Sequence, residues 1–118
     1  MQAGNDIPYF IDITTGFDIS TSGSTDPKCI TQLWWGRLEV KTFGTNGDVV
    51  MTIETSFDLI NWTPWNECSK LKLTESLTHI RMYELDGLWY RIVIDATNPL
   101  NTNTAGTMDA KLFIKALK

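Results

Sequence analysis

The feature that most constrains the fold of this chain is a two-residue alternation of apolar and polar side chains. In "DVVMTIETS" (48–56), Val49, Met51 and Ile53 share one parity, while polar side chains dominate the other. The same period marks "LWWGRLEVKTF" (33–43), "LWYRIVIDA" (88–96) and "TMDAKLFIKAL" (107–117). A period of two with many β-branched residues predicts strands that bury one face.

Turn residues separate these runs at short intervals. Asn46-Gly47 is a strong hairpin signal, and the segments 20–28 and 97–106 are polar loops rich in Ser, Thr and Asn. Only 68–77 resembles a short helix, and weakly. Because a parallel sheet needs crossover helices, the sequence predicts an all-β protein, an antiparallel β-sandwich of jelly-roll type with about seven or eight strands.

The length of 118 residues suits one domain with its own core. We expect a single β-sandwich domain over residues 9–118. The first eight residues, "MQAGNDIP", carry no strand pattern and are predicted to form a flexible N-terminal arm, 1–8.

Net charge and hydropathy limit the kinds of partner that this chain is expected to bind. Ten basic and fourteen acidic side chains give a formal net charge of −4, and no basic run is present, so we expect no nucleic-acid partner. No apolar stretch approaches the roughly 20 residues of a membrane span. The first ten residues lack the pattern of an export signal, so we expect synthesis in the cytoplasm, with Cys29 and Cys68 as reduced thiols.

The sequence offers no recognisable catalytic or cofactor motif. His79 is the only histidine and is predicted to be structural, and Cys29 and Cys68 do not form a CxxC zinc motif. There is no phosphate-binding glycine motif and no EF-hand spacing. Carboxylates are present, but nothing in their spacing singles out a hydrolytic pair. We therefore predict a protein that is not an enzyme and holds no cofactor or metal.

The stretch "ETSFDLINWTPW" (54–65) joins an alternating strand to a turn and two tryptophans. Pro64 cannot donate to a sheet ladder, which places this segment at an edge or in a loop. We expect Trp62 to fold over the end of the sandwich, burying about 200 Å², and Trp65 to lean towards burial. The alternative is a platform on which Trp62 and Trp65, aided by Asn61, stack sugar rings.

Two short motifs resemble the small β-sandwich proteins of tailed-phage virions. In that group one strand ends in Ser-x-Asp-Gly-x-Asn-Trp and a later strand carries Trp-Tyr-Arg-Ile. Over residues 30–118 the matching positions are Ser56, Asp58, Asn61 and Trp62, then Trp89, Tyr90, Arg91 and Ile92. Leu59 and Ile60 stand where Gly and one further residue are expected, which predicts a turn of a different type.

This resemblance implies a non-enzymatic structural role in the phage virion, as a capsid decoration or auxiliary protein, a head fibre or a tail component. The implied partners are other copies of the chain, in a trimer or other closed oligomer, and the major capsid or other virion proteins. The implied location is the virion, after synthesis in the host cytoplasm.

The alternation also predicts a contact surface. Three strands each place one large aromatic side chain among charges on the parity opposite the core. If the three share one sheet face, they form an apolar patch large enough for an interface; otherwise loop 97–106 or 14–28 covers them. The predicted contact residues are Trp35, Arg37, Trp89, Arg91 and Phe113.

A carbohydrate-binding β-sandwich module is the alternative function. Five tryptophans in 118 residues keep it open, with Trp62, Trp65 or Trp35 as the stacking surface and loop Asn and Asp side chains gripping sugar hydroxyls.

Overall fold

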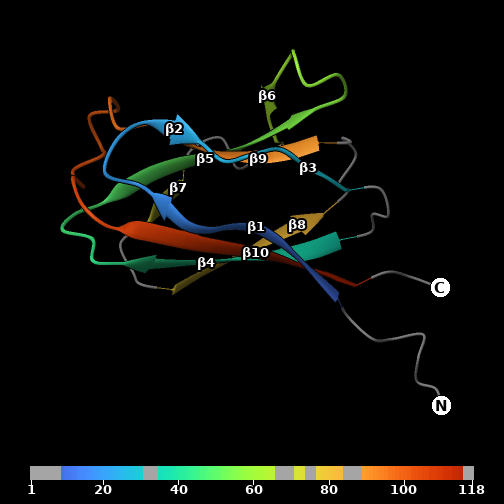
Figure 1. Cartoon of the computed structure of the whole chain (residues 1–118), viewed down its shortest axis with the longest axis horizontal. Helices are drawn as coiled ribbons and strands as arrows, with labels where there is room; N and C mark the ends of the chain where they lie inside the picture. Colours follow the sequence, from blue (N-terminus) through green and yellow to red (C-terminus); the bar gives the residue numbers. More distant parts are fainter. Residues whose placement is uncertain (1–8, 31–34, 66–70, 74–76, 84–88, 116–118) are drawn as a thin grey trace.

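Two antiparallel β-sheets face each other across an apolar core in the computed structural model (Figure 1). The structure describes residues 9–30, 35–65, 71–73, 77–83 and 89–115, and these contain strands but no helix. The strands are β1 (Tyr9–Asp18), β2 (Gly23–Ser24), β3 (Lys28–Cys29), β4 (Trp35–Phe43), β5 (Val49–Ser56), β6 (Thr63–Pro64), β7 (Leu71–Leu73), β8 (Leu77–Tyr83), β9 (Trp89–Ile94) and β10 (Thr107–Lys115).

The strand order is that of a jelly roll. One sheet has the order β1-β10-β4-β8 and the other the order β2-β9-β5-β6. β3 shares the place of β2, because both pair with β9, and β7 shares the place of β6, because both pair with β5. Each sheet thus has four strand places, and between β1 and β10 the chain changes sheet at every step except from β2 to β3 and from β5 through β6 to β7. This connectivity confirms the predicted all-β sandwich.

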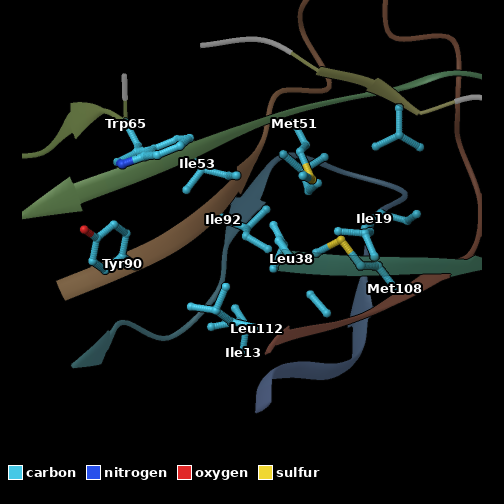
Figure 2. Packing of buried hydrophobic residues seen from close by; sticks show 14 of the residues in the cluster. Ile13, Ile19, Leu38, Met51, Ile53, Trp65, Tyr90, Ile92, Met108 and Leu112 are labelled. Carbon is cyan, nitrogen blue, oxygen red and sulfur yellow. The ribbon is translucent and has the colours of Figure 1, made fainter. Parts of the chain in front are cut away.

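The two-residue alternation in the sequence matches the alternation of buried and more exposed side chains in the structure. In β9 and β10 every second side chain is buried, and Arg91, Lys111 and Phe113 lie on the opposite faces. Figure 2 shows side chains from both sheets meeting between the layers. The core residues of β5, β9 and β10 are Val49, Met51, Ile53, Tyr90, Ile92, Ile94, Met108, Ala110 and Leu112.

Two local predictions were wrong. Asn46-Gly47 is not a hairpin turn, because β4 and β5 belong to different sheets and segment 44–48 crosses between them. The weak helix signal over 68–77 fails wherever the structure describes that segment: Leu71–Leu73 is a strand paired with β5, and β8 begins at Leu77. Pairing with β5 and β4 outweighs weak local propensity here.

The edge strand beside β9 is broken into β2 and β3, and the break lies where Pro27 follows Asp26. Proline has no N–H to donate to a ladder. Thr25 compensates from just before the break: its N–H donates to the Ile92 carbonyl, and its hydroxyl accepts the Ile92 N–H, both at 2.9 Å. The backbone of β9 therefore stays paired across the interruption, and the sheet keeps its outer surface.

A buried amide joins the loops at one end of the sandwich. Asn103 is 2 % exposed, and its Oδ1 accepts the Asn46 N–H at 2.9 Å. Its Nδ2 donates to the Ile19 carbonyl at 3.2 Å and to the Ala105 carbonyl at 2.7 Å. The long polar loop 97–106 is therefore a fixed part of the fold, because buried polar groups that are fully paired hold a single arrangement.

Candidate functional site

The turn between β5 and β6 is held by two side chains. Ser56 Oγ accepts the N–H groups of Asp58 (3.2 Å) and Leu59 (3.0 Å). Asp58 Oδ1 accepts the N–H groups of Ile60 (2.9 Å) and Asn61 (2.8 Å), and Asn61 Nδ2 donates to Asp58 Oδ2 (2.7 Å). These bonds from the Asn61 and Ile60 backbone stabilise the carboxylate and hold the pKa of Asp58 far below its usual range.

Leu59 has a φ of +66°, in the left-handed region that glycine favours. The resembling motif has Gly at this place, and Leu59 adopts a backbone conformation that glycine adopts more readily. The expectation of a different turn type stays a prediction. The left-handed conformation costs a leucine about 1–2 kcal/mol, which the hydrogen bonds of Ser56 and Asp58 help to offset.

This turn presents three apolar side chains to solvent, and we call them the apolar tip. Phe57 is 69 % exposed, Leu59 44 % and Ile60 79 %. The turn projects away from the two sheets beyond the end of β5 (Figure 1). Sequence reasoning treated 57–60 only as a turn and missed this surface, although three large apolar residues in four positions of a turn are a visible signal.

Of the two tryptophans after the turn, Trp65 is buried, as expected, whereas the expectation that Trp62 seals the end of the sandwich was wrong. Trp65 is buried in the core near Ile53 and Tyr90 (Figure 2), and its backbone N–H donates to the Ile53 carbonyl at 2.7 Å. Trp62 is only half-buried. Trp65 rather than Trp62 therefore closes this end of the core, and it offers no exposed ring face for stacking a sugar. Asn61 is exposed and serves the turn through Asp58.

Trp62 takes part in a charged cluster on the outer face of β5 and β9. The Arg91 guanidinium carbon lies 4.1 Å from the centre of the Trp62 ring. Glu54, directly opposite Arg91 in the sheet, holds that guanidinium through Oε1, at 2.9 Å from Nε and 2.8 Å from Nη2. This stacking and pairing fix the orientation of Arg91.

An open hollow of about 410 Å³, lined by both polar and apolar groups, lies beside this cluster, on the outer face formed by β2, β9 and β5. Arg91 and Glu54 form part of its wall, with hydroxyls from Ser24 and Thr52 and the carboxylate of Asp95. Hydroxyls, a carboxylate and a guanidinium are groups that hydrogen-bond sugar hydroxyls.

The opposite sheet carries a second exposed apolar surface, which we call the aromatic face: Phe10, Phe113, Arg37 and Lys111. The two rings lie with centroids 5.7 Å apart, with Phe10 52 % and Phe113 36 % exposed. Arg37 stands opposite Phe113 in the β4–β10 register, and Lys111 Nζ lies 5.2 Å from the centre of the Phe10 ring. Phe10 was missed because the short run "YFIDIT" has no clear alternation.

The predicted contact residues do not share one face. Trp35 and Phe113 are on β4 and β10 of one sheet, whereas Trp89 and Arg91 are on β9 of the other. A single patch of three aromatics is therefore ruled out, because the outer faces of the two sheets point in opposite directions. Trp89 is half-buried, Trp35 stands opposite Lys115, and the Trp35 side chain lies outside the described residues. Phe113 keeps 36 % of its surface exposed, so neither loop 97–106 nor loop 14–28 covers it fully.

The remaining sequence predictions concern metal ligands, the cysteines, His79 and membrane spans. Across the described ranges, no three His, Cys, Asp or Glu side chains gather as metal ligands. Cys29 is a free, exposed thiol on β3, whereas Cys68 and the side chain of His79 lie outside the described residues. The part of the chain that the structure describes contains no helix able to span a membrane.

No protein-family model matches this chain, and searches of curated proteins and of solved structures find no match either.

Proposed function

We propose that this chain is a structural component of a phage virion, a capsid decoration or head-fibre protein that works by contact and not by catalysis. The observation that carries the proposal is the pair of exposed apolar surfaces, the apolar tip and the aromatic face, on a rigid jelly-roll frame. Apolar patches of this kind mark surfaces that bind other proteins.

The fold alone does not decide the role, since jelly rolls serve in capsids and in lectins alike. The turn adds local support. It keeps a glycine-like conformation at Leu59 and uses Ser56, Asp58 and Asn61 to hold its shape, at the positions where the phage motif has its fixed residues. Burying each exposed side chain of the tip against a partner would contribute about 1.5–3 kcal/mol.

The test is direct detection in particles. Virions of the encoding phage are purified on a density gradient, washed in high salt and digested for mass spectrometry. The proposal predicts that peptides of this chain stay with the particle band through the wash. Their presence only in the soluble fraction, with capsid peptides in the band, would show that the chain is not a virion component.

A carbohydrate-binding module is the second candidate, favoured by the open hollow that Arg91 and Glu54 help to line. A sugar bound there would contact Arg91, whose guanidinium lies over the Trp62 ring, so Trp62 would respond to binding and the buried Trp65 would not. Fluorescence titration with a glycan panel tests this reading. A saturable change that Trp62→Phe removes and Trp89→Phe retains supports a lectin, whereas a flat response across the panel argues against it.

A further inference from the structure

We propose that copies of this chain join head to tail, with the apolar tip of one copy docking on the aromatic face of the next. The tip is Phe57, Leu59 and Ile60, and the face is Phe10 and Phe113 with Arg37 and Lys111 beside them. The inference rests on the proposed structural function, because it names the contact through which such a protein associates with itself.

The two surfaces of one copy cannot reach each other. The tip extends from β5 in the β2-β9-β5-β6 sheet, whereas the aromatic face lies on β1, β10 and β4 of the other sheet. Figure 1 shows the turn before β6 rising on the side of the sandwich away from β1 and β10. In the described part of the chain, each copy therefore carries one exposed tip and one exposed face, which a second copy is able to fill.

The tip is built to present side chains only. Every backbone N–H from 58 to 61 donates to Ser56 or Asp58 inside the turn, so its backbone donors need no partner from outside. The turn is also fixed before binding, which lowers the entropy lost on association. A rigid apolar projection of this kind fits a surface of exposed rings better than it fits a polar loop.

Charge selects the pairing of tip with face. The tip carries one ionised carboxylate, Asp58, and segment 55–61 has no Lys or Arg. On the aromatic face, Lys111 stands between the carboxylates of Asp12 and Glu39 in the register, whereas Arg37 stands directly opposite Phe113 and leaves a cation beside the rings. Tip-to-tip contact would bring two Asp58 side chains together, and face-to-face contact would bring two Arg37 side chains together, so both symmetric pairings are disfavoured. An anionic membrane is disfavoured for the same reason, because segment 55–61 carries a carboxylate and no Lys or Arg.

A tip-to-face contact is heterologous, so it closes into a ring or continues as an open stack according to the angle between copies. Three side chains supply less than the roughly 800 Å² per partner of a standard interface. We therefore expect a weak contact in free solution, with dissociation constants in the micromolar range or above, that ring closure or a capsid surface strengthens.

The test is complementation between two variants measured by sedimentation velocity. The tip variant carries Phe57→Ser and Ile60→Ser, and the face variant carries Phe10→Ser and Phe113→Ser. Leu100→Ser, at an exposed leucine outside both surfaces, is the matched control. Circular dichroism confirms that each is folded; Arg37→Glu with Lys111→Glu replaces the face variant if the phenylalanine changes unfold it.

The wild type and Leu100→Ser are expected to gain mass above the 13.4 kDa monomer as concentration rises, and each double variant alone to stay monomeric. An equimolar mixture of the two double variants retains one intact tip and one intact face, so it is expected to regain a dimer but no larger species. A mixture that stays monomeric, a double variant that associates like the wild type, or a wild type that remains monomeric would overturn the proposal. None of these results alters whether the chain is found in virions.

Discussion

Replacing Asn103 by alanine tests the account of how the loops are fixed to the sandwich. The Asn103 amide makes three hydrogen bonds at a buried position: it accepts from Asn46 and donates to the carbonyls of Ile19 and Ala105. Alanine removes all three and leaves one N–H and two carbonyls without these partners. At about 0.5–1.5 kcal/mol each, we expect a loss of roughly 2–4 kcal/mol in the free energy of unfolding.

That loss is large for a chain of this size, whose total stability is expected to be about 6–18 kcal/mol from typical per-residue values. Urea unfolding followed by tryptophan fluorescence measures it, because buried Trp65 reports on the core. With a slope of about 2 kcal/mol per molar urea, the midpoint is expected to fall by roughly 1–2 M.

Thr104→Ala is the matched control in the same loop. Thr104 is exposed, and its hydroxyl accepts a single bond from the Asn46 side chain at 2.9 Å, so we expect a change within about 0.5 kcal/mol. A change of that small size for Asn103→Ala as well would refute the reasoning, because the buried amide would then not hold the loops.

Three further predictions concern the turn and the core. Trp65→Ala is expected to cost about 3–5 kcal/mol and Trp62→Ala clearly less, since only Trp65 is buried in the core; equal losses in urea unfolding would contradict this. Thr55→Val is expected to stabilise the fold by about 1 kcal/mol, because the Thr55 hydroxyl is buried without a hydrogen-bond partner in the described part of the chain; a lowered melting temperature would oppose this. Asp58 has a folded pKa below its ordinary 3.8, so its contribution is complete above that value and is lost as pH falls through the folded pKa. The stability advantage of the wild type over Asp58→Asn is thus expected to shrink from pH 5 to pH 2, and an advantage that stays constant over this range would count against the turn geometry.

The alternation predicted which side of each long strand faces the core, but it carries no information about which sheet a strand joins. Trp89 and Phe113 both have outer parity, and both predictions of parity are confirmed, yet the two residues lie on opposite sheets. Strand pairing depends on contacts between segments far apart in the chain, such as β10 with β4, and no local pattern records them. The same limit explains why Asn46-Gly47 is a crossing between sheets and not a hairpin.

The places of Trp62 and Trp65 follow from the register of the β5–β6 hairpin, which the structure supplies. In the β5–β6 hairpin Glu54 pairs with Pro64, so Trp65 stands opposite Ile53 and Trp62 opposite Ser56. Residues directly opposite each other share a face, which turns Trp65 inwards with Ile53. The conformation of Leu59 was not predictable in this way, because leucine rarely adopts a positive φ and the hydrogen bonds that hold it come from the folded turn.

The measurement that tests the central claim most directly is hydroxyl-radical footprinting of purified virions and of the free chain. Phe57 and Ile60 are the most exposed large apolar side chains of the described residues, so they are expected to oxidise readily in the free chain. If the chain works by contact through its apolar tip, both become protected in the particle, while exposed apolar side chains away from the partner surface keep their reactivity. Equal oxidation of Phe57 and Ile60 in the free and particle-bound chain would contradict the account.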